Sequence, residues 1–308
     1  MSFIFIFMLR LMKKVLLAYI TLTLYNRQSV LSTIEKGVFM KKFFDFAKKL
    51  FKSITIAEYI IYFVSLTAII TSALLTKFAF DGIIDPVTLS ASIIGVTAII
   101  LVSKGNPIGQ GLTIVFSALY AIASFNNKLY GEMITYLGMS APIAACALIV
   151  WIRHPANGNK SEVKVNQIKL KEYGLLIVLT AAITTAFFFI LRELNTSQLA
   201  ISTFSVATSF IASYLTARRS KFYAIGYALN DLVLIIIWAT ACFKSIDNLP
   251  ICINFSAFFI LDAYGFINWN RMERKQKKLD EEAMKNHDEQ IENNAETEEC
   301  STENNHSI

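Results

Sequence analysis

Charged residues are scarce in this chain. Of its 308 residues only 17% are Asp, Glu, Lys or Arg, whereas 55% are hydrophobic and 13% aromatic. A soluble domain usually carries about 25% charged residues, so the composition excludes an ordinary soluble protein. The basic residues behind the net charge of +6 fall in short clusters between apolar segments. Such clusters are typical of membrane orientation and do not suggest nucleic-acid binding.

Histidine and cysteine are equally sparse, which excludes most metal and redox sites. The three histidines, His154, His287 and His306, lie outside the apolar segments, and the four cysteines form no CxxC pair. The motifs GxxxxGK[ST], GxGxxG, GxSxG and HExxH are missing as well. We therefore expect no metal, no cofactor and no catalytic residue, and we do not expect an enzyme.

What the sequence has instead is a series of long apolar segments. A helix that crosses a bilayer needs about 20 such residues. The segments are separated by short loops, which predicts an all-α polytopic membrane protein built as a compact bundle. The expected spans are 56–78, 88–103, 108–125, 130–152, 173–191, 198–217, 222–243 and 249–269.

The two ends of the chain differ from this apolar middle. Residues 1–39 are interrupted by basic residues and lack a small-residue cleavage site, so we expect the native start at Met40. Residues 40–52 alternate apolar and basic side chains, which predicts an interfacial amphipathic helix before an extra transmembrane helix at 53–80. Residues 271–308 are acidic and polar, and we expect a disordered tail there.

Lysine and arginine are distributed unequally between the two sides of the predicted bundle. Nineteen lie in loops that alternate onto one side, and four lie on the other. The positive-inside rule makes the richer side cytoplasmic, and with it the C-terminal tail, in a multi-pass protein of the cell membrane. The basic-rich loops are 41–52, 104–107, 153–171, 218–221 and 271–278.

A weak internal repeat relates two parts of the chain. Leu101-Val-Ser-Lys104 ends one span much as Tyr214-Leu-Thr-Ala-Arg218 ends another. Two spans later, Trp151-Ile-Arg153 and Trp269-Asn-Arg271 form a second matching pair. The repeat therefore covers three consecutive spans in each part.

We interpret these parts as two three-helix repeats, 88–152 and 197–270, joined by a linker transmembrane helix at 172–192. The shift between the repeats is four crossings, an even number, so both have the same orientation. Parallel repeats related by an axis along the membrane normal are a known transporter architecture.

The segment 221–238 is apolar enough for a bilayer, yet it carries Asn230 and Asp231 side by side. A carboxylate within a span costs about 2.5–3.5 kcal/mol and normally faces a cavity or a partner. We therefore predict that this helix forms the wall of a substrate site. Its polar and aromatic face, spaced by three or four residues, consists of Tyr223, Tyr227, Asn230, Leu234 and Trp238.

Two other spans carry polar stripes at helical spacing. In the first, Gln110 and Tyr120 are too large for close helix packing, so this stripe favours a cavity. The second holds only small hydroxyl residues, for which close packing is the interpretation we favour. The stripes are Gln110, Thr113, Ser117, Tyr120 and Ser124, and Ser202, Ser205, Ser209, Ser213 and Thr216.

Three carboxylates lie within the spans 130–152, 222–243 and 249–269, and no lysine or arginine lies at the depth of the inner two. Glu132 is near the outer end, where solvation explains it, while Asp231 and Asp262 are deeper. The deep acids can bind a cation, carry a proton or accept hydrogen bonds. With aromatic residues nearby they suit a flat cationic or polar ring. The lack of a basic clamp argues against a phosphorylated substrate.

Four segments together resemble the PnuC family of vitamin B3 transporters. They span both predicted repeats, about residues 88 to 271. The segments are Tyr130-Gly-Glu-Met-Ile-Thr-Tyr-Leu-Gly-Met with Pro142 and Trp151, Tyr214-Leu-Thr-Ala-Arg-Arg219, Asn230-Asp-Leu-Val-Leu-Ile-Ile-Ile-Trp238, and Asp262-Ala-Tyr-Gly-Phe-Ile-Asn-Trp269.

The resemblance implies a three-plus-one-plus-three fold similar to a full-length SWEET transporter, here with one extra N-terminal span. It implies facilitated diffusion of nicotinamide riboside, a phosphate-free molecule with a cationic ring, followed by trapping through cytosolic phosphorylation. A homo-trimer is implied as well. The family's site positions carry over best to Asn230. Our candidate substrate-binding residues are Asn230, Tyr120, Trp238, Tyr223, Asp231, Asp262, Tyr227, Gln110 and Ser117.

The chain departs from the family at a Trp-x-x-Trp motif just before the asparagine. Tyr223 and Gly226 stand at those positions, so one ring is replaced and the other is lost. This departure leaves open a carrier for another vitamin, such as thiamine, or for a sugar. A substrate-binding subunit of an ATP-driven vitamin importer is a further alternative, although the internal repeat speaks against it.

Overall fold

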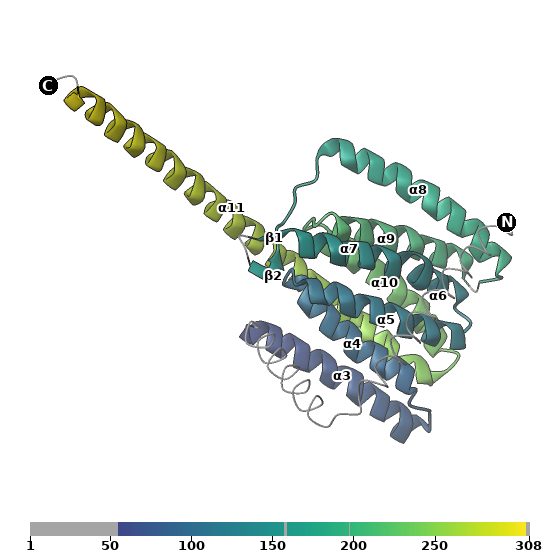
Figure 1. Cartoon of the computed structure of the whole chain (residues 1–308). Helices are drawn as coiled ribbons and strands as arrows, with labels where there is room; N and C mark the ends of the chain where they lie inside the picture. The colour runs from purple at the N-terminus through teal and green to yellow at the C-terminus, as the bar shows by residue number, and fades with distance from the viewer. Residues whose placement is uncertain (1–54, 157–158, 197, 306–308) are drawn as a thin grey trace, which may run out of the picture. The chain divides into compact units, whose positions relative to one another are not determined.

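The computed structural model describes residues 55–156, 159–196 and 198–305 (Figure 1). The predicted extension 1–39 and amphipathic helix 40–52 lie outside these residues. Within them, eight helices are long and apolar enough to cross a membrane, as the sequence predicts. Two of the helices, α6 and α7, belong to a single span, Tyr130–Arg153. The helices are α3 (Ile56–Phe80), α4 (Pro86–Ser103), α5 (Pro107–Asn126), α6 (Tyr130–Thr135), α7 (Ala141–Arg153), α8 (Leu170–Glu193), α9 (Leu199–Ala217), α10 (Tyr223–Cys242) and α11 (Leu249–Asn305).

Local sequence explains where α4 and α5 begin. The Asp85 side chain accepts hydrogen bonds from the backbone N–H groups of Val87 and Thr88, each at 3.1 Å. Asn106 accepts from the Ile108 N–H at 3.0 Å. In both helices a proline follows the cap, where its missing N–H costs nothing and its fixed φ favours helix.

The fourth span is interrupted. Between α6 and α7, residues Tyr136–Ser140 form a π-helical turn. Pro142 lies in the first turn of α7, and a proline inside a continuous helix removes a donor and crowds the carbonyl four residues earlier. The wider turn relieves this conflict, and such turns are frequent at functional sites.

Two tryptophans join the two sets of three spans reciprocally. Trp151 at the end of α7 donates its indole N–H to the Thr216 carbonyl of α9 at 2.9 Å. Trp269 of α11 donates to the Val102 carbonyl of α4 at 3.0 Å. Both side chains are fully buried, and their ring centroids are 5.5 Å apart. Each set of spans therefore anchors its third helix on the first helix of the other.

The turns after α4 and α9 have the same hydrogen bonds. The Gly105 N–H bonds the Val102 carbonyl at 2.9 Å, and the Arg219 N–H bonds the Thr216 carbonyl at 3.0 Å. Both turn residues have a left-handed φ, +66° and +59°. Glycine adopts this conformation without strain, whereas arginine does not.

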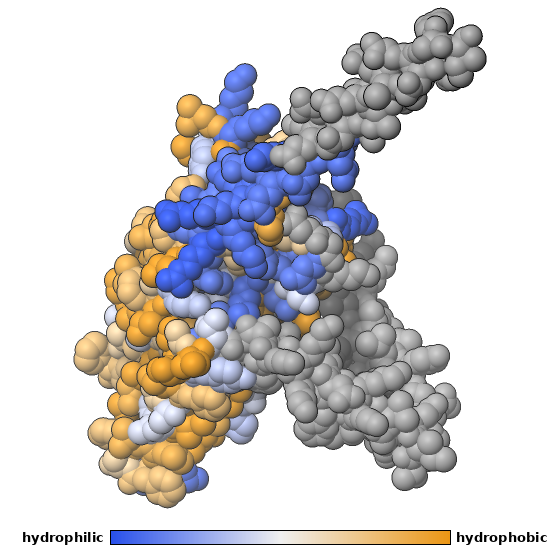
Figure 2. Space-filling model, turned by 90° about the vertical axis from the view of Figure 1, so that its left-hand side faces the viewer, coloured by the Kyte–Doolittle hydropathy of each residue, from blue (hydrophilic) through white to orange (hydrophobic). Residues whose placement is uncertain are grey.

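A short antiparallel pair, β1 (Pro155–Ala156) and β2 (Asn159–Val163), lies at the end of the bundle that also carries these turns. We call this the hairpin end and the opposite end the far end. The loop charges predict that the hairpin end is cytoplasmic. Figure 2 views the molecule from this side and shows hydrophilic residues gathered there beside hydrophobic flanks.

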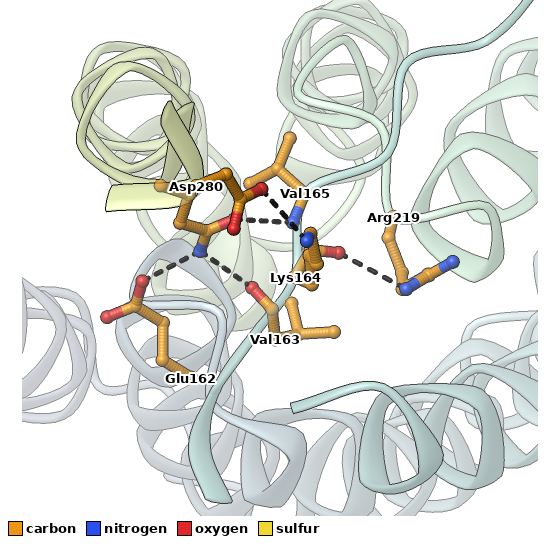
Figure 3. A network of polar contacts seen from close by, with 7 residues as sticks. Glu162, Val163, Lys164, Val165, Arg219 and Asp280 are labelled. Carbon is orange, nitrogen blue, oxygen red and sulfur yellow. Dashed lines mark hydrogen bonds and ion pairs between the residues drawn. The ribbon is translucent and has the colours of Figure 1, made fainter. Parts of the chain in front are cut away.

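The expected disordered tail at 271–308 is wrong for the described part of it, because α11 continues as one helix to Asn305. Its first turns beyond the bundle are held by β2 and the loop after it. Gln276 accepts a hydrogen bond from the Val165 N–H at 2.8 Å and donates to Glu162 and to the Val163 carbonyl (Figure 3). Composition alone does not reveal these partners, which stabilise helix where the sequence resembles a disordered tail.

Candidate functional site

A small cavity of about 60 Å³ lies in the hairpin half of the bundle. Residues from α4, α5, the π-turn, α9, α10 and α11 line it. Five of the nine predicted site residues are among them: Gln110, Tyr223, Tyr227, Asp231 and Asp262. The sequence therefore identified both acids and one amide of the lining.

The two acids of the cavity face each other. Asp231 of α10 and Asp262 of α11 are 3% and 2% exposed, and their carboxyl groups are close enough to interact directly. Within the described residues the Asp231 Oδ2 atom has no further partner. Two carboxylates this close repel when both are ionised, so a proton or a cation stabilises the pair.

Asn230 lies directly behind the cavity wall and is only 1% exposed. Its Oδ1 atom accepts hydrogen bonds from the hydroxyls of Thr208 and Ser209, each at 2.9 Å. Ser209 itself lines the cavity. With its acceptor doubly occupied, Asn230 has its amide N–H₂ left to donate.

Tyr120 and Trp238 do not line the cavity but close its far side. The Trp238 indole N–H donates to the Tyr120 hydroxyl at 2.7 Å, and both side chains are fully buried. Tyr120 also packs edge-to-face on Tyr136, with centroids 4.3 Å apart. We call this cluster the aromatic layer: Phe116, Tyr120, Tyr136, Trp238, Phe255 and Phe258.

Ser117, the remaining candidate, does not line the cavity. Its hydroxyl donates to the Thr113 carbonyl one turn earlier at 2.8 Å, and its side chain is fully buried. Thr113, which belongs to the same predicted stripe, does line the cavity. Ser117 therefore allows close packing of α5.

Several lining residues are absent from the predicted set. Tyr136 and Ser140 reach the cavity through the π-turn, and Phe116 and Phe258 present their rings from α5 and α11. The only signal for Ser209 is its place in the hydroxyl stripe of α9, which we interpreted as packing. Close helix packing occurs beside this stripe as well, because Gly226 of α10 packs so closely on Ala212 of α9 that an added Cβ would lie 2.9 Å from the Ala212 Cα.

This close approach explains the departure from the Trp-x-x-Trp pattern. The backbone of α9 occupies the space beside Gly226, so no ring fits there. Tyr223 keeps an aromatic environment, with its centroid 4.9 Å from Trp269 and 6.2 Å from Tyr227. Its buried hydroxyl has no hydrogen-bond partner in the described part of the chain.

The basic residues near the cavity are engaged at the hairpin end. Arg218 forms a bidentate pair with Glu172, and this hydrogen bond raises the pKa of the arginine. Lys221 pairs with Glu273 at 2.8 Å. Among the described residues no lysine, arginine or histidine lines the cavity, and no cluster of acids, histidines and cysteines is suited to a metal.

A larger groove of about 590 Å³ lies between α3 and α11, but its chemistry is different. Its lining residues are apolar or carry small hydroxyls, and none of them is charged. A groove of this kind suits lipid chains, so we place the candidate site at the smaller cavity with its paired acids.

Comparison with known proteins agrees with this fold. A "Nicotinamide riboside transporter PnuC" from Neisseria mucosa is 24% identical over 189 residues, 60% of this chain and 72% of the relative. Its counterpart from Haemophilus influenzae is 22% identical over 186 residues, covering 60% and 79%. A crystal structure of the vitamin B3 transporter PnuC matches with a TM-score of 0.65 and 22% identity, covering 75% of this chain and 97% of the other.

The sequence model of one transporter family matches residues 85–271, which is more than half of the chain. The match begins just before α4 and ends within α11, so it contains every helix that lines the cavity. The protein therefore belongs to the nicotinamide mononucleotide transporter family, the PnuC family, whose members are membrane transporters and not enzymes.

Proposed function

We propose that this protein carries nicotinamide riboside across the cell membrane by facilitated diffusion. The positively charged pyridinium ring would bind in the cavity beside Asp231 and Asp262. Cytosolic phosphorylation would then trap the product, because a phosphate does not suit this site. The C-terminal end of α11 would lie in the cytoplasm, as the loop charges predict.

The observation that carries the proposal is a pair of buried acids without a base. A cationic ring supplies the charge that the pair lacks, and the walls add the aromatic faces of Tyr223 and Tyr136. Tyr120 and Trp238 would stand behind this first layer of rings. A mononucleotide, the ligand in the family's name, adds a phosphate for which the described cavity offers no cationic partner.

Asn230 would supply the directional contact. Thr208 and Ser209 occupy its Oδ1 atom, so its N–H₂ group would donate to an acceptor on the ligand. The carbonyl oxygen of the carboxamide and the ribose oxygens are both suitable acceptors. A buried polar contact of this kind discriminates strongly against ligands that cannot make it.

The size of the cavity supports a carrier with moving halves. Ligand pockets usually measure about 300–1,000 Å³, whereas this cavity is about 60 Å³. Binding must therefore expand it. We infer that two parallel three-helix repeats, 88–152 and 197–270, move relative to each other around the site. The reciprocal contacts of Trp151 and Trp269 would act as the pivot. In a homo-trimer, each subunit would make this movement by itself.

The test is uptake of labelled nicotinamide riboside into proteoliposomes that contain only the purified protein. We expect saturable uptake that Asn230→Ala reduces at least about tenfold, equivalent to about 1.4 kcal/mol. Asn270→Ala is the matched control, because the Asn270 amide donates to the Phe266 carbonyl one turn away and Asn270 does not line the cavity. Equal uptake by wild type and Asn230→Ala would remove Asn230 from the site.

The same preparation separates the alternatives. A thiamine carrier would bind thiamine more tightly than nicotinamide riboside in a ligand panel. A substrate-binding subunit of an ATP-driven importer would bind its ligand but give no uptake without its partner. Tyr223 and Gly226 replace the aromatic pair, so thiamine is the first competitor to include.

A further inference from the structure

Another buried acid lies outside the site described so far. Glu132, in the first turn of α6 at the far end, is 1% exposed. The sequence suggested that solvent covers it, and the structure contradicts this. Its Oε2 atom accepts one long hydrogen bond of 3.3 Å from Ser205, and its Oε1 atom has no partner among the described residues.

Other unpartnered polar side chains lie beside Gly131, the residue before Glu132. A Cβ added to the neighbouring Gly131 would lie 3.1 Å from the Thr196 side chain and 3.3 Å from that of Ser202. Both hydroxyls are buried and, in the described structure, lack hydrogen-bond partners. Buried polar groups are normally satisfied, so unpartnered groups clustered at one place indicate a missing ligand.

The position of this cluster connects the surface with the aromatic layer. Tyr136 of the aromatic layer follows Glu132 by four residues, about one helical turn. Three residues before it, Leu129 lines a pocket of about 220 Å³ at the far end, together with Gln198. The α9 stripe continues inward from Ser205, which bonds Glu132, to Ser209, which bonds Asn230.

We propose that Glu132, Ser202 and Thr196 form an outer cation subsite, which receives the positively charged ring before it passes the aromatic layer. This inference rests on the proposed function and adds a second binding station to it. The carboxylate supplies the charge, and the two hydroxyls accept from the carboxamide or ribose. The station would be used while the far half is open and the inner cavity is closed.

Two lysines line the surface pocket, and their positive charges repel a cation. Lys128 and Lys244 line it, but both are exposed to solvent. Salt screens exposed charges beyond about 8 Å at physiological ionic strength, whereas a buried carboxylate is screened much less. We therefore expect Glu132 to dominate the electrostatic potential between the surface pocket and the aromatic layer.

The test compares uptake with binding. Glu132→Gln should lower the initial rate of nicotinamide riboside uptake into proteoliposomes at least about tenfold at subsaturating external substrate, equivalent to about 1.4 kcal/mol. The dissociation constant of the detergent-solubilised protein should stay within about threefold, because the inner cavity is intact. Glu132→Asp should restore most of the rate. Glu193→Gln is the matched control, an exposed acid at the same end of the bundle.

Each outcome has one meaning. Wild-type uptake by Glu132→Gln, or an equal loss of uptake and of detergent binding, would overturn the subsite. If Glu132→Gln does not fold, Ser202→Ala takes its place, with the same split between uptake and binding expected and a smaller loss. Absence of uptake by the unaltered protein would remove the proposed function itself, and the subsite with it.

Sodium is the other cation that a buried carboxylate attracts. Uptake should be the same when external sodium is replaced by N-methyl-D-glucamine. A sodium requirement that Glu132→Gln abolishes would assign the carboxylate to an inorganic ion and contradict the proposal.

Discussion

The hairpin half and the far half of the bundle are closed by different means. The hairpin half contains the cavity, and polar contacts hold its end, such as Gln276 to Val165 at 2.8 Å and Lys164 to Asp280 at 2.9 Å. The far half is closed by the aromatic layer, in which, within the described part of the chain, a hydrogen bond from Trp238 to Tyr120 is the only polar link between side chains of different helices.

This difference affects how each half can open. Water replaces individual polar contacts at little net cost, because an intramolecular hydrogen bond contributes only about 0.5–1.5 kcal/mol. Water cannot replace the contacts between packed rings one at a time, so the helices that carry the rings must separate together. We therefore expect the acids to determine what binds, the rings to determine the stability of the closed far half, and the hairpin contacts to determine local mobility.

The largest expected effect comes from the acid pair. In the double variant Asp231→Asn/Asp262→Asn, the dissociation constant for nicotinamide riboside should rise at least about 100-fold, equivalent to about 2.7 kcal/mol. The reason is that a cation taken out of water then has no counter-charge. Isothermal titration calorimetry on purified protein measures the change.

The single variants sharpen this prediction. Each should bind more weakly than wild type and more tightly than the double variant, since one carboxylate still offsets the ring. Asp280→Asn is the control, because Asp280 pairs with Lys164 at the hairpin end and does not line the cavity. Wild-type affinity in the double variant would show that the rings alone bind the ligand.

A smaller effect is expected in the aromatic layer. Tyr120→Phe keeps the ring but leaves the buried Trp238 indole N–H without an acceptor. An unsatisfied buried group costs about 1–3 kcal/mol, so the melting temperature in detergent should fall while ligand affinity changes little. Tyr130→Phe, a partly exposed tyrosine at the same end, should melt like wild type. If both variants melt alike, the layer gains nothing from this bond.

Much of the fold followed from local pattern. Apolar length located all eight spans to within a few residues, because every span in a bilayer must be a continuous run of this kind. Helical spacing also predicted that Tyr223, Asn230 and Trp238 share a buried face. The continuation of α11 past residue 271 was missed, since its support comes from Gln276 contacts more than a hundred residues away in the sequence.

The site was predicted less completely. The acids could be identified because a carboxylate in a span needs a reason to be there. Tyr136 and Ser140 could not, because a π-turn decides where they point and the sequence shows only Pro142 nearby. Whether Asn230 faces a cavity or lies behind its wall also depends on tertiary packing, here on the two hydroxyls of α9.

The smallest effect should come from the hairpin end. Gln276→Ala removes the acceptor of the Val165 N–H, so the exchange of this amide hydrogen should accelerate about five- to tenfold, in line with about 1 kcal/mol for one hydrogen bond. Ligand affinity should not change, because Gln276 does not line the cavity. Hydrogen exchange over residues 159–169 measures the effect, and Lys275→Ala, at the exposed neighbouring position, is the control. A loss of affinity in Gln276→Ala would mean that the polar contacts of this end also shape the binding site, and the two halves would then not divide their tasks in this way.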